Sequence, residues 1–481
     1  MSNSIKKNYL FNLLNTISGM LFPLITFPYA ARIMQADGIG QINFYSSIIG
    51  YVSLFTSLGI PMYAVREIAR VRDDVKARNN LAAEILLLHL LLSFVGYLIV
   101  GIISFFVPQV QLNIPLFFLL SLSILFTTIG CDWFYQGIED FKYITIRGLV
   151  IKILSVAILF VTVKTKNDLM WYGFYCVFGV LGGNIFNFLR LGKYKDESPI
   201  VFSNLHPLRH FKSVLHVFAL VFVISIYINL NTVMLGFMQN NESVGLFTTA
   251  TKITSLCLGI MAALQSVMIP QMSNLVALGR TSEFSALAQK SLSFSMFISL
   301  PMSVGVFLTA PYLIKLLAGP SYLPTIMSLR IISGIIFMIG ISGVLGMQIL
   351  FPKGKENIVI KSTALGAIVN VILNIFLIPR YSQYGAAIST MVAEFVVTGS
   401  MMFLGKTELP IKWNIVSNWI YLLASCVMGI LIYLFEKIGM CDFCSLLGSV
   451  IIGMISYVIV LFLCKESMLN FILNFIKSKI K

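Results

Sequence analysis

The chain has 481 residues, of which 58% are hydrophobic and only 11% are charged. Ordinary soluble domains carry roughly 25% charged residues, so this composition excludes a water-soluble globule and indicates a polytopic membrane protein. The 34 Lys and Arg outnumber the 19 Asp and Glu, which gives a net charge of +15. Such an excess makes nucleic acid a candidate partner unless the positions of the charges explain it.

Apolar runs between polar, Gly or Pro breaks mark the expected membrane-spanning helices. A helix needs about 20 residues to cross the hydrocarbon, and by that measure the sequence predicts an all-α fold with about 14 transmembrane helices. The first span follows Lys6 and Lys7 and is too long for the apolar region of a cleaved signal peptide, so we expect it to be retained. In chain order the predicted spans are 10–33, 42–65, 83–107, 115–136, 147–163, 170–190, 213–236, 245–270, 291–316, 324–350, 360–378, 385–404, 415–435 and 447–464.

Lysine and arginine are distributed unevenly between the two sides of these spans. Most lie in the loops that follow even-numbered spans and in the two tails. Short loops rich in positive charge stay on the cytoplasmic side, so both termini are expected in the cytoplasm. The net charge is then explained by topology and by contact with anionic membrane lipids, and no nucleic-acid partner is expected.

The chain is expected to divide at its longest hydrophilic stretch. The predicted parts are an N-terminal lobe of six spans at 1–190, a cytoplasmic linker at 191–212, a C-terminal lobe of six spans at 213–405, and two final helices with a basic tail at 406–481. Segments 34–40 and 238–245 are similar, and each joins the first two spans of its lobe. Because six is even, the lobes would point the same way and be related by a pseudo-two-fold axis along the membrane normal.

No metal site or bound cofactor is expected. Most of the seven cysteines lie inside apolar runs, where a thiol behaves as a small hydrophobe. Cys441 and Cys444 form a C-x-x-C motif in a connecting loop, which can indicate redox chemistry, but the βαβ pattern of thioredoxin-like motifs is missing. The four histidines have neither metal-ligand nor triad spacing.

Several strings along the chain together carry a family resemblance. The strings are Pro28-Tyr-Ala-Ala-Arg32-Ile-Met-Gln-Ala-Asp-Gly38-Ile-Gly40, Asp132-Trp-Phe-Tyr-Gln-Gly137-Ile-Glu-Asp-Phe-Lys142, Val244-Gly-Leu-Phe-Thr-Thr-Ala250-Thr-Lys252, Ile269-Pro-Gln271, and Ile378-Pro-Arg-Tyr381 followed by Gly385-Ala-Ala387. In this order they resemble the polysaccharide flippase branch of the multidrug/oligosaccharidyl-lipid/polysaccharide exporter superfamily, the Wzx-type flippases of O-antigen and capsule repeat units. One departure is Met34-Gln35, where many members carry Leu-Gly.

The resemblance implies two six-helix lobes around a central cavity, with two additional C-terminal helices. It further implies alternating access that carries an undecaprenyl-pyrophosphate-linked oligosaccharide from the cytoplasmic to the outer leaflet of a bacterial inner membrane. Polysaccharide assembly proteins are candidate partners in that case.

Cations within the spans are the first candidates for binding such a substrate. A pyrophosphate crosses hydrocarbon only if a wet, cationic groove replaces its hydration, and Arg and Lys suit phosphate oxygens. Lys252 lies deep in the eighth span; the alternatives are a snorkelling side chain or a pair with a carboxylate such as Glu394. Arg32 follows Pro23 and Pro28, two residues that can kink the helix. The alternative is that Arg32 anchors the helix at the membrane interface. Arg330 is a further candidate, whereas Arg66 also fits a positive-inside topology charge.

Two carboxylates are candidates for coupling transport to H⁺ or Na⁺. Glu394 lies in the middle of the twelfth span and Asp132 near the inner end of the fourth. A group that binds and releases an ion as the lobes rearrange is needed for uphill transport. The alternative for either residue is a structural ion pair or a helix cap.

Two pairs of asparagines share helix faces inside the spans. Asn370 and Asn374 have i, i+4 spacing, and Asn12 and Asn15 have i, i+3 spacing. Their amides could contact sugar hydroxyls, although hydrogen bonding between helices is the commoner use of such residues.

Three rival functions remain. A peptidoglycan-precursor lipid flippase would also need a cationic groove, and composition leaves it open. A cation-coupled drug antiporter of the same superfamily would need a more acidic cavity than this chain offers. An integral-membrane polysaccharide enzyme is least favoured, because the outer loops are short and present neither paired carboxylates nor a His beside a nucleophile.

Overall fold

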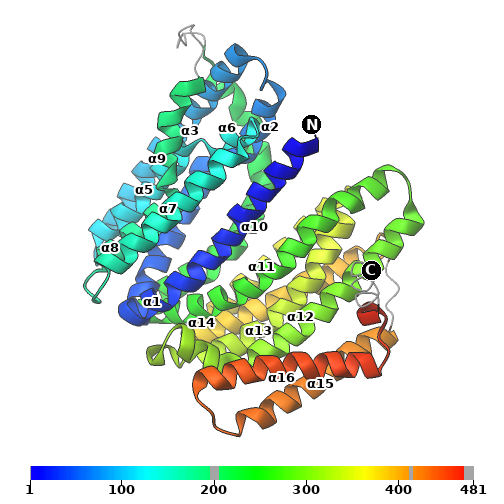
Figure 1. Cartoon of the computed structure of the whole chain (residues 1–481). Helices are drawn as coiled ribbons and strands as arrows, with labels where there is room; N and C mark the ends of the chain where they lie inside the picture. Colours follow the sequence, from blue (N-terminus) through cyan, green and yellow to red (C-terminus); the bar gives the residue numbers. More distant parts are fainter. Residues whose placement is uncertain (1, 195–204, 411–414, 471–481) are drawn as a thin grey trace. The chain divides into compact units, whose positions relative to one another are not determined.

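The computed structural model describes residues 2–194, 205–410 and 415–470. Within these ranges the chain forms helices and no strand, so the expected all-α fold is confirmed (Figure 1). The helices in chain order are α1 (Ser2–Ser57), α2 (Ile60–Arg70), α3 (Val75–Phe106), α4 (Pro108–Gln111), α5 (Ile114–Gly130), α6 (Asp132–Gly137), α7 (Phe141–Thr162), α8 (Leu169–Leu181), α9 (Gly183–Leu191), η1 (Gly192–Tyr194), η3 (Pro207–His210), α10 (Phe211–Met238), α11 (Asn241–Ala277), α12 (Thr281–Leu317), η4 (Pro320–Tyr322), α13 (Thr325–Gly343), η5 (Val344–Leu350), α14 (Glu356–Leu404), α15 (Ile415–Glu436) and α16 (Asp442–Leu463).

Contacts between residues divide the chain into two compact units, Met1–Gly245 and Leu246–Lys481. Helix α10 belongs to the first unit, where it packs on α1 and α2. Helix α11 begins in the first unit and continues in the second. The division into lobes at 1–190 and 213–405, the linker at 191–212 and the symmetry between the lobes stay predictions.

Ten helical segments of the described chain are long and apolar enough to cross a membrane, or eleven if the bent pair α8 and α9 forms one span. Two long helices are broken by non-helical residues, α1 at Gln35 and α14 at Ser382. At about 1.5 Å per residue, α1 and α14 are each long enough for two crossings of about 30 Å. Both breaks fall between spans that the sequence predicts as separate, while the total of fourteen spans stays a prediction.

Each unit has its own hydrophobic core. In the first unit, Trp133, Phe134 and Tyr135 of α6 are buried among apolar residues of α2 and α3. The hydroxyl of Tyr135 donates to the carbonyl oxygen of Asn187 in α9 at 2.6 Å. The conspicuous aromatic string after position 132 therefore serves packing.

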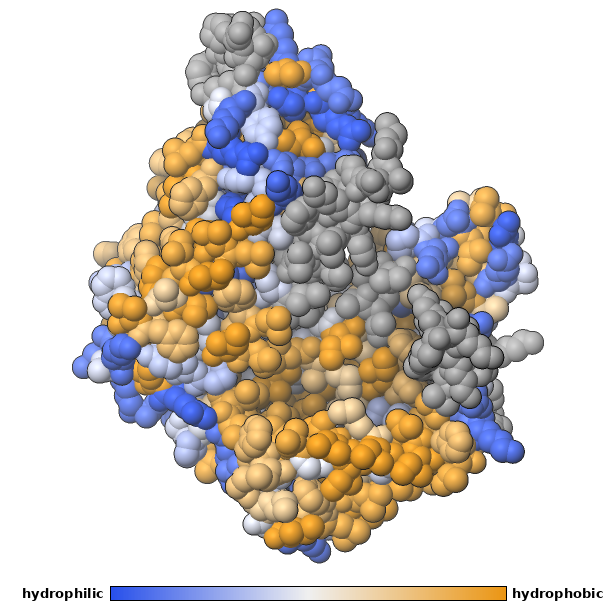
Figure 2. Space-filling model, in the orientation of Figure 1, coloured by the Kyte–Doolittle hydropathy of each residue, from blue (hydrophilic) through white to orange (hydrophobic). Residues whose placement is uncertain are grey.

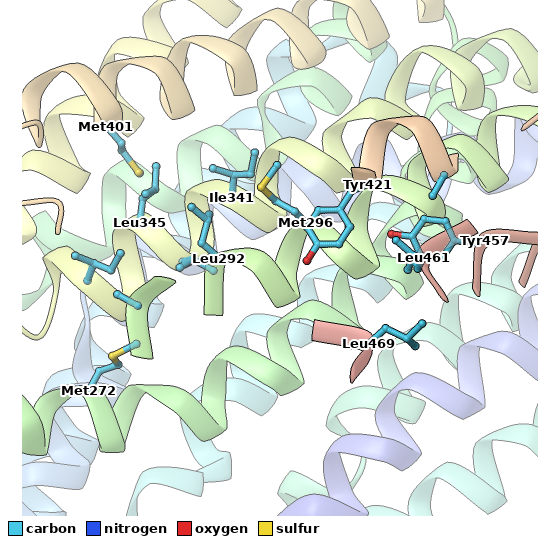
Figure 3. Packing of buried hydrophobic residues seen from close by; sticks show 14 of the residues in the cluster. Met272, Leu292, Met296, Ile341, Leu345, Met401, Tyr421, Tyr457, Leu461 and Leu469 are labelled. Carbon is cyan, nitrogen blue, oxygen red and sulfur yellow. The ribbon is translucent and has the colours of Figure 1, made fainter. Parts of the chain in front are cut away.

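The core of the second unit is built from α11 to α16 (Figure 3). Tyr421 and Tyr457 bring the last two helices onto α12, and the Tyr457 hydroxyl donates to the carbonyl oxygen of Phe297 at 2.9 Å. Helices α15 and α16 also pack along each other (Figure 1). The two C-terminal helices are thus an integral part of their unit.

On the face shown in Figure 2, hydrophobic residues cover broad areas and hydrophilic residues gather in separate groups. Such a surface is unfavourable in water and matches hydrocarbon, as expected of membrane-spanning helices. On α16 the exposed residues include Phe443, Leu447, Ile451, Met454, Ile455 and Phe462.

Candidate functional site

Arg32 lies on the exposed face of α1, three residues before the break at Gln35. The opposite face of this turn is packed, because Ala30 and Ala31 are buried. The neighbouring Tyr29 hydroxyl donates to the carbonyl oxygen of Val163 at 2.7 Å, which fixes this part of α1 to the end of α7. Arg32 is therefore held at the surface of its unit, where it is accessible to an anion.

Lys252 is half-buried in α11, eleven positions after the helix begins. At about 1.5 Å per residue this places it about 16 Å along the helix. Ala250, Ile253 and Thr254 beside it are buried. The side chain of Lys252 thus emerges from a packed helix at a depth where a charge needs water, a partner or an anionic ligand.

Arg330 lies in a groove of the second unit between α12, α13 and α15. Its Nε donates to the carbonyl oxygen of Phe307 at 3.3 Å, and the guanidinium is 5.5 Å from the centre of the Phe307 ring. The groove has a volume of about 690 Å³, and Cys426 and Tyr433 line it from α15. Lys252 is not among the residues that line this groove.

Arg66 lies at the exposed end of α2. Its guanidinium pairs with Glu67 at 2.9 Å and is 5.6 Å from the ring centre of Tyr63. Glu67 also binds Arg70 at 3.1 Å. This arrangement is typical of a solvated, partly neutralised helix end and fits the topology alternative for Arg66.

Asp132 takes part in a cluster of polar groups at the start of α6. Its Oδ1 accepts from Arg147 at 3.1 Å and from the side-chain amide of Asn187 at 2.7 Å. Asn187 is fully buried and also donates to the carbonyl oxygen of Gly130 at 2.7 Å. The structure thus contains the ion pair that the alternative for Asp132 predicts, and ion coupling by Asp132 stays a prediction.

Glu394, Asn370 and Asn374 are all buried in α14. The side-chain amide of Asn374 donates to Oδ1 of Asn370 at 3.0 Å. A Cβ on Gly366 would lie 2.3 Å from the Val397 side chain, and a Cβ on Gly385 would lie 2.4 Å from the Leu377 carbonyl oxygen, so the two halves of α14 pack closely and antiparallel.

This register places Asn370 within about one helical turn of the level of Glu394. The Nδ2 atom of Asn370 is buried without a hydrogen-bond partner in the described part of the chain. A carboxylate and amides that are distant in sequence therefore occupy one polar layer between the halves of α14, which is called the α14 polar layer below. The side chains of Asn12 and Asn15 lie outside the described residues.

A family model described as polysaccharide biosynthesis protein matches residues 5–276, more than half of the chain. The chain belongs to this family. It is 25% identical over 408 residues to a protein of Escherichia coli (strain K12) named "Putative O-antigen transporter", which covers 84% of this chain and 98% of that protein.

Solved structures share the fold of this polysaccharide biosynthesis family member. The lipid II flippase MurJ, in an inward closed conformation, has a TM-score of 0.76 at 17% identity and covers 94% of this chain and 98% of that one. A multidrug resistance MATE family transporter of the MOP superfamily, facing inward, has a TM-score of 0.65 at 14% identity and covers 81% and 94%. The predicted resemblance is therefore confirmed at the level of family and fold.

The family match includes some of the predicted site residues and leaves others outside it. Arg32, Arg66, Asp132 and Lys252 lie within residues 5–276. Arg330 and the α14 polar layer lie beyond this range. Only the geometry of the second unit therefore supports a role for those residues.

Sequence reasoning missed a buried network that secures the chain before α10. Glu84 of α3 is 2% exposed and accepts from the backbone N–H of His206 at 2.9 Å. Its other oxygen is hydrogen-bonded to Nε2 of His210 at 2.8 Å and pairs with Arg209. The hydroxyl of Tyr63 is 2.7 Å from Nδ1 of His210. The sequence contains a signal for this network. It is a single Glu near the start of an apolar span, together with an Arg-His pair in the basic linker.

The C-x-x-C motif forms the N-terminal cap of α16. The Sγ of Cys441 accepts from the backbone N–H of Cys444 at 3.3 Å. The hydrogen bond from the Cys444 side chain is the main cause that lowers the pKa of the Cys441 thiol below its ordinary value. Both residues are exposed free thiols, so the motif is accessible to reagents from solution.

Proposed function

We propose that this protein is a flippase that moves a lipid-linked oligosaccharide from the cytoplasmic to the outer leaflet by alternating access. The observation that carries the proposal is the family match together with the relative named as an O-antigen transporter, which is matched over nearly its whole length. The apolar, multi-span fold supports it, since the fold is shared with the lipid II flippase MurJ and with a MATE family transporter. The proposed cargo carries an undecaprenyl-pyrophosphate head, and the proposed location is a bacterial inner membrane with both termini in the cytoplasm.

Arg32 and Lys252 are the proposed ligands of the pyrophosphate. Both lie on helices whose neighbouring residues are packed, and neither is fully buried. A cation held at this depth replaces part of the hydration that the diphosphate loses. Arg330 is a weaker candidate because it faces a groove within the second unit, and Arg66 because it already pairs with Glu67.

Ion coupling is proposed to use the α14 polar layer. Glu394 is 6% exposed, and the adjacent asparagine amides can orient a proton or a sodium ion bound at its carboxylate. The protein itself would need no other cofactor. Polysaccharide assembly proteins are proposed as partners that use the lipid-linked product on the outer leaflet.

Deletion of the gene, followed by analysis of the lipid-linked glycans in each leaflet, tests the proposal. Loss of the flippase should cause an oligosaccharide linked to undecaprenyl pyrophosphate to accumulate on the cytoplasmic leaflet, and expression of the intact chain should reverse this. Accumulation of the peptidoglycan precursor instead would favour the second candidate, a peptidoglycan-precursor flippase, which the shared fold with MurJ makes worth testing. Unchanged lipids in both leaflets would contradict both proposals.

A further inference from the structure

A basic pocket lies in the first unit where α7 meets α9 and η1. It has a volume of about 470 Å³, and its lining includes Arg147, Arg190 and Lys193. None of the residues proposed above to bind the transported lipid lines it. This α7–α9 pocket is therefore a concentration of positive charge that the proposed transport function does not use.

The two arginines are held in place by groups at the edge of the pocket. Arg190 lies over the ring of Tyr143, with its guanidinium carbon 3.7 Å from the ring centre, and binds Asp140 at 2.9 Å. Tyr194 also fixes this pair, because its hydroxyl donates to the Asp140 carboxylate at 3.0 Å. Preorganised guanidinium groups lose little conformational freedom when they bind a phosphate.

Arg147 is positioned by Asp132 at one end and by a glycine beside its side chain. Its Nη1 binds Oδ1 of Asp132 at 3.1 Å, and a Cβ on Gly183 of α9 would lie 2.9 Å from its Nε. The Nε atoms of Arg147 and Arg190 are both buried without a hydrogen-bond partner in the described part of the chain. Each arginine thus keeps donors that its carboxylate does not use.

The charge of the pocket favours an anion. Its lining contains three cations and no carboxylate, since Asp132 and Asp140 contact the arginines from outside the lining. Lys193 is exposed and has no ion pair among the described residues. Counting the two carboxylates, the cluster retains a net positive charge.

The pocket walls indicate that the anion carries an apolar tail. Val150, Phe186 and Leu189 line the pocket and are 49%, 51% and 69% exposed, so they form an apolar surface leading away from the cations. Arg190 is the last residue of the sixth predicted span, and Lys193 follows it on the side that the distribution of positive charge predicts to be cytoplasmic. Basic pockets between helices at this level suit the heads of anionic lipids.

We propose that the α7–α9 pocket binds the phosphate head of a membrane lipid, with the lipid chain lying along the exposed apolar residues of α7 and α9. Two lipids supply this chemistry, an anionic phospholipid of the bilayer or an isoprenoid diphosphate. Binding of a bilayer phospholipid requires only a membrane protein, whereas binding of an isoprenoid diphosphate rests on the proposed flippase function.

The test uses the purified full chain in detergent, titrated with phosphatidylglycerol, phosphatidylcholine, an isoprenoid diphosphate or inorganic phosphate, with bound molecules counted by native mass spectrometry. Phosphatidylglycerol should bind, and Arg190→Gln and Lys193→Gln should each weaken its binding about tenfold, the loss expected for one charge-assisted contact. Lys193 is exposed, so its substitution should leave folding unchanged. Lys142→Gln is the matched control, because Lys142 is exposed on the first turn of α7 and does not line the pocket.

The outcomes of this titration distinguish the two candidate lipids and include results that would overturn the proposal. Displacement of phosphatidylglycerol by the isoprenoid diphosphate, with the same dependence on Lys193, assigns the pocket to that lipid; no displacement assigns it to the bilayer phospholipid. Equal binding of phosphatidylcholine, equal loss in Lys142→Gln, or binding of inorganic phosphate as tight as that of the lipids would overturn the proposal.

Discussion

A Cβ atom on Gly40 would lie 2.7 Å from the backbone nitrogen of Gly245. The same Cβ would lie 1.6 Å from the carbonyl oxygen of Asn241, and a Cβ on Gly245 would lie 1.9 Å from the carbonyl oxygen of Ala36. The two glycines end the two segments that resemble each other in the sequence, 34–40 and 238–245. These segments meet reciprocally, backbone against backbone, where α1 crosses the beginning of α11.

Gly40→Ala should lower the stability of the protein strongly. The added methyl group overlaps backbone atoms, which cannot rotate away as a side chain would, and overpacking of this kind costs about 1–3 kcal/mol or more. The measurement is thermal unfolding of the purified protein in detergent. Gly101→Ala is the control, because its added Cβ meets no atom within 4 Å, so it should be neutral or slightly stabilising. Equal behaviour of the two variants would contradict the close contact.

Gln35→Gly should stabilise the protein. Gln35 has φ 57° and ψ −178° at the break in α1, a conformation that glycine adopts without strain. Strain of this kind costs about 1–3 kcal/mol. The midpoint of thermal unfolding should therefore rise in Gln35→Gly. Gln35→Ala keeps a Cβ, so its midpoint of thermal unfolding should not rise. If Gln35→Gly were no more stable than Gln35→Ala, the backbone at Gln35 would not be strained.

The break at Gln35 illustrates what the sequence could and could not predict. Apolar runs separated residues 10–33 from 42–65, so a turn between them was predictable. Many members of the flippase family carry Leu-Gly where this chain has Met34-Gln35, and the positive φ of Gln35 shows why glycine suits the second position. Hydrophobicity and helix propensity are properties of short stretches of sequence. The helices and the membrane class could therefore be predicted from the sequence.

The candidate site was only partly predictable, because contacts between distant residues leave no local signal. Glu394 and Asn370 were singled out for separate reasons, and only the antiparallel packing of α14 places them at one level. The place of Arg330 inside its predicted span could be read from the sequence, but the contact of its guanidinium group with Phe307 of α12 depends on packing. Asp132 was recognised as a charge in a span, whereas its partners Arg147 and Asn187 come from α7 and α9.

Cys441 should react with a water-soluble maleimide at a lower pH than an ordinary thiol. Hydrogen bonds from Cys444 lower its pKa, so more thiolate is present at a given pH, and the thiolate is the reacting form. Under reducing conditions, Cys444→Ala removes the side-chain donor and should shift the pH profile of Cys441 labelling upward. Cys464→Ala leaves the motif intact and should not move the profile. An unchanged profile in Cys444→Ala would show that Cys444 does not activate its neighbour.

Lys252→Ala should abolish export of surface polysaccharide while the amount of inserted protein stays normal. The half-buried Lys252 supplies the charge proposed to bind the diphosphate, and loss of a charge-assisted contact weakens binding about tenfold or more. Lys252→Arg keeps the charge and should retain much of the export, which separates electrostatics from packing. Full export by Lys252→Ala, measured from surface glycan in cells lacking the native gene, would count against the proposed ligand.

Glu394→Gln should remove the dependence of transport on an ion gradient. The substitution preserves the volume of the side chain in the α14 polar layer, but the amide can neither release a proton nor bind sodium as a carboxylate does. Transport of a lipid-linked oligosaccharide in sealed vesicles, with imposed proton or sodium gradients, measures the effect. Glu356→Gln is the matched control, since Glu356 is an exposed carboxylate at the start of the same helix. If Glu394→Gln responded to the gradients as the unmodified protein does, the coupling ion would have to bind elsewhere, and the α14 polar layer would be left with a structural role in joining the two halves of the helix.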